Sequence, residues 1–110
     1  MEFDLSVFEK QNEMNEIARE KYVRLVEKEK ALKNRIGERR ITQVKIAAQV
    51  GISDSMISFW LKKERELGIA SVMKMLDTLL NEEALLNLRI ESEVERLEGV
   101  RAGRRNHAGK

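Results

Sequence analysis

Small, hydroxyl-bearing and amide side chains lie close together between residues 43 and 62, in an order suited to recognition chemistry. The segment reads QVKIAAQVGISDSMISFWLK. Two helices that cross at a steep angle through a three- or four-residue turn need a small side chain at the crossing, and Ala47 provides one. Four places later, Gly51 tolerates the left-handed backbone that such a turn contains. The spacing therefore predicts a helix-turn-helix, an arrangement that places its second helix in the major groove of DNA.

The residues around the turn indicate which side of the second helix is anchored. Ser53 is the expected N-cap, because its hydroxyl can accept a hydrogen bond from the first turn of the next helix. That helix then begins near Asp54. Apolar side chains at helical spacing are expected to point into a core. They are Ile46, Val50, Ile52, Ile57 and Trp60.

The other side of the second helix carries the side chains expected at base edges, namely Asp54, Ser55, Ser58 and Phe59. Serine hydroxyls bond to several bases, and a phenyl ring contacts the methyl group of thymine. A carboxylate here either accepts from a cytosine amino group or favours the positive end of the helix, and we expect the second role for Asp54. The alternative is a helix face that is merely solvated.

Donors and cations around the two helices suit the phosphates of duplex DNA. Thr42 and Gln43 begin the first helix, where side-chain and backbone donors can meet a phosphate, and we assign Ser53 to the same surface. Basic side chains would displace counterions from the DNA. Those nearby are Arg39, Arg40, Lys45, Lys62 and Lys63.

The net charge of +2 conceals a division of charge along the chain. Residues 31–63 contain seven Lys and Arg against two Asp and Glu, and residues 99–110 contain four against none. Residues 1–30 contain six against eight, and residues 64–98 contain four against nine. A basic middle between acidic flanks indicates a surface that faces phosphates. It weighs against an ordinary helical hairpin whose exposed face binds protein.

Upstream, apolar residues at four- and three-residue spacing predict a helix from about residue 13 to residue 36. Glu29 interrupts the stripe, and Asn12 and Asn15 are expected to cap or fray the start of the helix. The stripe consists of Ala18, Tyr22, Leu25, Leu32 and Ile36. A separate short segment is expected from Phe3, Leu5, Val7 and Phe8.

A second apolar stripe follows the helix-turn-helix, on a run that contains no glycine before Gly99. Acidic residues at positions 82, 83, 91, 93 and 95 supply its polar neighbours. A helix that reaches away from a small core cannot bury such a stripe alone, so self-association is expected. The alternative is that it folds back on the N-terminal helix of the same chain. The residues expected to mediate oligomerisation are Leu79, Leu86, Ile90, Val94 and Leu97.

These patterns predict an all-α chain built around a small, lambda-repressor-like helix-turn-helix domain. Residues 1–37 form an N-terminal helical extension and residues 38–80 form the DNA-binding domain. Residues 81–98 form the oligomerisation helix. Residues 99–110, with three glycines and four basic side chains, are expected to be a flexible tail.

The composition argues against an enzyme. The chain has no cysteine, and its one histidine, His107, lies in the glycine-rich tail, so no Ser-His-Asp or Cys-His set and no metal cluster can be assembled. No phosphate-binding loop is present, and we expect no cofactor. Apolar runs of about 18 residues are absent, so we expect no membrane contact and a cytoplasmic protein.

Residues 31–80 resemble the CII-type transcriptional activators of lambdoid phages. The matching elements are LKNRI at 32–36, Lys45 to Lys62, and VMKML at 72–76. The resemblance implies a phage regulator that assembles into tetramers through a C-terminal helix and activates promoters beside RNA polymerase. Phe59 stands where members of that family usually carry a basic residue. Their aromatic end to the fourth helix has no counterpart after Leu80.

The leading prediction is therefore a sequence-specific regulator that binds double-stranded DNA as a homo-oligomer. Two other classes stay open. A DNA-packaging recognition subunit of the small-terminase kind also combines a helix-turn-helix with an oligomerising helix, and it would depend on a packaging ATPase. A helical adaptor that binds protein would show no salt-dependent affinity for DNA.

Overall fold

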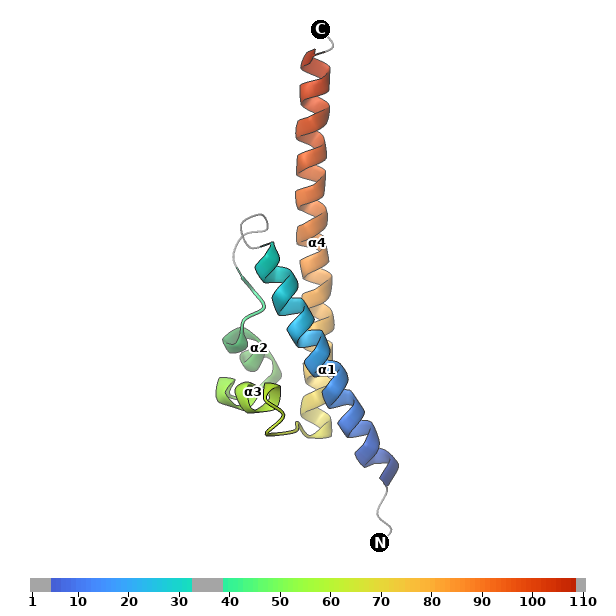
Figure 1. Cartoon of the computed structure of the whole chain (residues 1–110), viewed down its shortest axis with the longest axis vertical. Coiled ribbons are helices and arrows are strands. Elements are labelled where there is room, and N and C mark those ends of the chain that lie inside the picture. Colours follow the sequence, from blue (N-terminus) through green and yellow to red (C-terminus); the bar gives the residue numbers. More distant parts are fainter. Residues whose placement is uncertain (1–4, 33–38, 109–110) are drawn as a thin grey trace.

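The structure, a computed structural model, describes residues 5–32 and 39–108, with side chains up to residue 99. Helices make up nearly all of it: α1 (Leu5–Ala31), α2 (Gln43–Val50), α3 (Asp54–Leu61) and α4 (Ile69–Ala108). The all-α prediction is confirmed. Figure 1 shows α1 crossing the lower part of α4, with the short α2 and α3 beside them. Within the described ranges, no helix combines the length and the apolar character needed to cross a membrane.

Helix α1 begins earlier than the sequence suggested. Leu5, Val7 and Phe8 belong to it and not to a separate segment. Asn12 and Asn15 lie well inside the helix, so the prediction that they cap or fray its start was wrong. The physical reason is that residues 1–36 contain neither proline nor glycine to break the helix. The helix ends at Ala31, and the predicted end at Ile36 and the predicted Phe3 segment lie outside the described residues.

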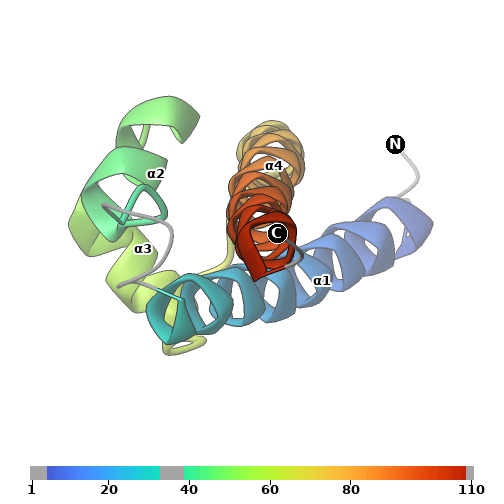
Figure 2. The same ribbon diagram turned by 90° about the horizontal axis from the view of Figure 1, so that it is seen from above.

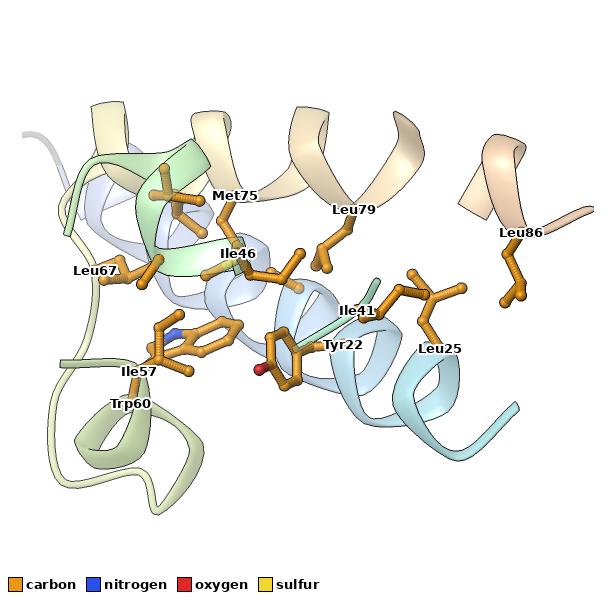
Figure 3. Packing of buried hydrophobic residues seen from close by; sticks show 14 residues of the cluster. Tyr22, Leu25, Ile41, Ile46, Ile57, Trp60, Leu67, Met75, Leu79 and Leu86 are labelled. Atoms are coloured by element: carbon orange, nitrogen blue, oxygen red, sulfur yellow. The ribbon is translucent and has the colours of Figure 1, made fainter. Parts of the chain in front are cut away.

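All four helices contribute to one core, in which Trp60 of α3 lies beside Tyr22 of α1 (Figure 3). The Trp60 side chain has no exposed surface, and its ring meets Tyr22 of α1 edge to face, with centroids 6.0 Å apart. Met75 and Leu79 close the core from α4. The predicted inward residues Ile46, Val50, Ile57 and Trp60 are all buried, and Ile52 is partly buried against them.

Helix α4 continues where the sequence predicted a flexible tail. It passes through Gly99 and Gly103 and ends at Ala108, and no element boundary occurs at residue 81. A glycine inside a helix costs only about 1 kcal/mol relative to alanine, so two glycines without a proline do not have to end it. The C-terminal part of α4 projects beyond the other helices in Figure 1, and the molecule measures 80 × 26 × 19 Å.

The apolar stripe of α4 is covered from within the chain over its first half. Leu79 and Leu86 have no exposed surface and point from α4 toward α1 (Figure 3), so neither is available to a partner chain. They were expected to mediate oligomerisation, but α1 of the same chain lies along α4 and covers them, which is the alternative that the sequence left open. Ile90 is partly buried at the end of this contact. Val94 and Leu97 are 47% and 43% exposed.

Glutamates 82 and 83, expected on a solvated face of α4, contact other helices instead. Glu82 is buried and accepts a hydrogen bond from the Gln49 amide of α2 at 3.1 Å. Glu83 pairs with Lys21 of α1 at 2.9 Å. Viewed from above (Figure 2), α1 crosses one side of α4 and the α2–α3 unit lies on another. These polar contacts therefore fix α4 to both neighbours.

Candidate nucleic-acid interface

The turn between α2 and α3 has the geometry that the sequence predicted. Gly51 has φ = 84° and ψ = 33°, in the left-handed region that favours glycine. Its N–H donates to the carbonyl of Ala47 at 2.9 Å, and the N–H of Ile52 donates to the same carbonyl at 3.0 Å. Ala47 is buried where the two helices cross. Ala47 therefore lies at the crossing of the two helices and also accepts both hydrogen bonds of the turn.

Side-chain caps define where both helices begin. The Thr42 hydroxyl accepts from the N–H of Lys45 at 3.3 Å, and the Ser53 hydroxyl accepts from the N–H of Met56 at 3.1 Å. Each cap satisfies a backbone donor that would otherwise be left without a partner at a helix start. The predicted cap at Ser53 and the start of α3 at Asp54 are confirmed. In the structure, Thr42 and Ser53 therefore serve as helix caps.

The outward face of α3 is largely accessible. Asp54, Ser55 and Phe59 are exposed, while Ser58 is half-buried. The amide of Gln43, at the start of α2, donates to the carbonyl of Asp54 at 2.6 Å and to the hydroxyl of Ser58. Gln43 was predicted to meet a phosphate, and its role as a bridge between α2 and α3 was missed. In this bond the Ser58 hydroxyl is the acceptor.

The predicted cations form two groups that the fold does not bring together. Lys62 and Lys63 follow α3 and are exposed. Arg39, Arg40 and Lys45 surround the start of α2, where the Lys45 ammonium donates to the carbonyl of Arg39 at 3.3 Å. Arg39 lies 3.7 Å from the carboxylate of Glu29, which offsets part of its charge. For Arg40 and Lys45, by contrast, no ion pair is seen among the described residues.

Asn15 of α1 holds the far end of α3, and the sequence analysis missed it. Its side-chain oxygen accepts from the indole N–H of Trp60 at 2.8 Å and from the N–H of Leu67 at 2.9 Å. Its amide nitrogen donates to the carbonyls of Leu67 and Gln11 at 3.0 and 2.9 Å. Asn15 is fully buried, and these four bonds satisfy its side chain. The sequence offered one sign of this role: Asn15 lies three positions before Ala18, in line with the apolar stripe of this helix.

Arg19, one turn after Asn15, continues this support. Its guanidinium donates to the carbonyl of Trp60 and to the carbonyl of Arg65, and it forms an ion pair with Glu66. It also lies over the Trp60 ring, 5.3 Å from the centroid. A cation in this position gains from the charge distribution of the ring. The end of α3 and the segment after it are thereby bound to α1 by polar contacts.

Glu29, which interrupted the apolar stripe, is buried and supports the start of α2. Its carboxylate accepts from the backbone N–H groups of Arg40 and Ile41 at 2.9 and 3.1 Å, and it pairs with Arg89 of α4 at 2.7 Å. Burial alone would raise the pKa of this carboxyl. The hydrogen bond from Arg40, the contact with Arg89 and the bond from Ile41 outweigh burial and hold the pKa below its usual value.

Glu29 therefore binds three parts of the chain together in its ionised form. Among the residues that the structure describes, no three His, Cys, Asp or Glu side chains lie close enough together to hold a metal ion. The α2–α3 unit itself presents hydrogen-bond donors, hydrogen-bond acceptors and positively charged side chains.

Residues 32–80 match the family model described as helix-turn-helix. The match covers α2, α3 and the first part of α4, which is somewhat less than half of the chain. No curated protein and no solved structure was found to match the chain. Over these residues the chain is thus similar to helix-turn-helix domains.

Proposed function

We propose that this protein is a sequence-specific transcription regulator that inserts α3 into the major groove of double-stranded DNA. The observation that carries the proposal is the division of α3 into two faces. Ile57 and Trp60 are fully buried, while Asp54, Ser55 and Phe59 are exposed. A helix held by one face and accessible on the other meets the requirement for groove reading.

The surrounding groups are placed to contact the DNA backbone. The first turn of α2, with Thr42 and Gln43, lies next to the start of α3 through the Gln43–Asp54 bond. Donors there would contact phosphates on one side of the groove. Lys62 and Lys63 would contact phosphates beyond the other end of α3, and Arg40 and Lys45 would contact those near α2. These contacts set the register of α3 on the duplex without reading sequence.

Selection from fragmented genomic DNA with the full-length chain tests this proposal. We expect one recurring motif to be recovered, and transcript levels near that motif to change when the protein is produced. Recovery without enrichment of any motif would contradict sequence-specific binding. Enrichment that requires a packaging ATPase would instead assign the chain to DNA packaging.

The resemblance to CII-type activators supports a finer proposal. We infer that the regulator is phage-encoded, activates transcription and works beside RNA polymerase. A reporter fused to the recovered motif would rise in expression under this proposal. A fall in expression would identify a repressor and would leave the DNA-binding proposal intact.

We further propose that the chain forms a homo-oligomer through the projecting part of α4. Residues 91–108 extend about 27 Å beyond Ile90 at 1.5 Å per residue. In proteins most of the stability of a helix comes from packing of its apolar face, and the other described helices do not reach this part of α4 (Figure 1). Val94 and Leu97 are exposed on it, and Ile90 connects them to the core. A second copy of α4 would cover these side chains.

A further inference from the structure

The outward side of α3 lacks arginine and lysine, the side chains that most often read guanine. The sequence of α3 is DSMISFWL, and the cations begin only at Lys62, after its last residue. Guanine is read in the major groove mainly by arginine or lysine, which donates two hydrogen bonds to its O6 and N7 atoms. The N-terminal turns of α3, which approach the bases in this class of domain, carry neither. Recognition by α3 therefore does not use the paired hydrogen bonds that arginine or lysine makes to guanine.

Phe59 is the large apolar side chain that α3 leaves exposed. Ile57 and Trp60 are buried, and Met56 and Leu61 are partly buried against the core. Phe59 is 46% exposed and lies one helical turn after Ser55, which is also exposed. Contact between an exposed phenyl ring and an apolar surface removes both from water, which is favourable. Phe59 is therefore suited to contact an apolar group on the ligand.

Hydrogen bonds to α1 and α2 hold α3 in place and leave the Phe59 ring on its exposed face. Ser58 accepts a hydrogen bond from Gln43, whose amide also bonds to the carbonyl of Asp54. The first two turns of α3 are therefore tied to α2. The end of α3 is tied to α1 through Asn15 and Trp60. Phe59 projects from a helix that is held at both ends.

We propose that Phe59 reads thymine in the bound duplex by packing on the C5-methyl group. This inference rests on the proposed function. Among the groups that base pairs present in the major groove, the thymine methyl is the apolar one, and the others donate or accept hydrogen bonds. Each half-site of the operator then contains thymine at a fixed position opposite Phe59.

Replacement of thymine by uracil tests this contact, because it removes the methyl group and leaves the hydrogen-bonding pattern of the base unchanged. The probe is the duplex recovered by selection with the full chain, in which each thymine is replaced in turn by deoxyuridine. At one position per half-site we expect about a fourfold loss of affinity, the effect of one buried methyl group. Phe59→Ala should bind the parent duplex more weakly and should no longer respond to the replacement at that position.

Leu80→Ala is the matched control, since Leu80 is a similarly exposed apolar residue on α4. It should bind like the parent chain and keep the full response to deoxyuridine. The melting temperature of Phe59→Ala should stay close to that of the parent, because its ring is not in the core. If the parent chain binds its selected duplex tightly but ignores every replacement, the thymine contact is refuted and the DNA-binding proposal stands.

The same response in Phe59→Ala as in the parent would also refute the thymine contact, because the methyl group would then be sensed by another residue. If no duplex is selected at all, the proposed function itself fails, and base reading by Phe59 fails with it.

Discussion

At the residue scale, neighbouring side chains of α3 have opposite roles. Ser55 is exposed, and in the structure its hydroxyl meets only that of Ser53, at 3.4 Å. We expect Ser55→Ala to leave the melting temperature nearly unchanged, because an exposed hydroxyl adds little to stability. Specific binding should weaken by about 1–3 kcal/mol if the hydroxyl contacts a base. Ser58→Ala should weaken binding similarly, with a small loss of stability because Gln43 loses an acceptor.

Replacement of Trp60 should instead lower stability and affect DNA binding only through unfolding. Trp60→Ala empties the centre of the core and also leaves Asn15 without its indole donor. We expect a loss of about 3–5 kcal/mol in the free energy of unfolding, measured by urea denaturation. DNA binding should then disappear in proportion to the unfolded fraction. An unchanged denaturation midpoint would show that the indole does not hold α3.

The stability of the fold should depend on acid pH through Glu29. Its pKa is lower in the folded chain than the ordinary value of 4.5. The folded state therefore binds protons less readily than the unfolded state, and the stabilisation is fully present above about pH 4.5. It is lost as the pH falls from there through the folded pKa. Melting temperatures measured from pH 7 down to pH 3 should decrease accordingly.

Glu29→Gln should remove much of the dependence of stability on pH. At pH 7 it should lower the free energy of unfolding by about 3–5 kcal/mol, because Arg89 would keep its charge without this buried partner. Glu20→Gln is a suitable control, since Glu20 is exposed and makes only a 3.7 Å surface pair with Arg24. It should leave both the stability and its pH profile close to those of the parent. If the melting temperature falls with pH as steeply in Glu29→Gln as in the parent, the role assigned to Glu29 is contradicted.

At the element scale, the sequence predicted the two short helices better than the two long ones. Local signals specify α2 and α3: Thr42 and Ser53 cap them, and Gly51 makes the turn between them. These effects act within four residues, so they can be read from the sequence. The apolar stripes of α1 and α4 were also visible. A stripe shows that a face is buried but not which surface buries it, and self-association was expected where α1 covers Leu86.

The missed site residues share a physical cause. Asn15, Arg19 and Glu29 are polar residues on the buried face of α1. Apart from Gln11, which lies four positions before Asn15, their side-chain partners lie 10 to 60 positions away along the chain. Local spacing carries no information about such pairs. A polar residue within an apolar stripe was the one available sign, since a buried polar group has to find hydrogen-bond partners. Glu29 showed this sign, because it interrupts the apolar stripe of α1.

The projecting part of α4 should control assembly without controlling the fold. Deletion of residues 91–110 removes the exposed Val94 and Leu97 but keeps Leu79 and Leu86 in the core. We expect light scattering to show a dimer or tetramer for the full chain and a smaller assembly for the deletion. The thermal unfolding of the domain should persist. A longer deletion from residue 81 should unfold the domain because it removes Leu86.

A full-length chain that is monomeric at micromolar concentration would contradict the assembly proposal. The double variant Val94→Glu, Leu97→Glu is a second test of assembly, because it places charge on the exposed apolar face of α4 without shortening the helix. This variant should reduce assembly as the deletion does. Leu88→Glu, on an exposed position of α4 outside the stripe, should leave the assembly unchanged.

At the scale of the whole molecule, charge is distributed to suit a polyanionic ligand. The basic residues 31–63 contain α2, α3 and the segments beside them, while acidic residues predominate in 1–30 and 64–98. Acidic flanks repel DNA, so they favour orientations in which the α2–α3 unit approaches first. The elongated shape keeps the end of α4 away from that unit (Figure 1). DNA binding and assembly can therefore occupy different ends of the molecule.

The dependence of duplex affinity on salt concentration is the most direct test of the claim that this unit faces phosphates. With about five phosphates neutralised per subunit, log Kd against log salt should change with a slope of about 4 to 5 in magnitude, and affinity should fall as salt rises. Lys62→Gln should reduce the slope by about one, whereas Lys74→Gln, on an exposed position of α4, should not change it. An affinity that stays flat as salt rises would contradict the account.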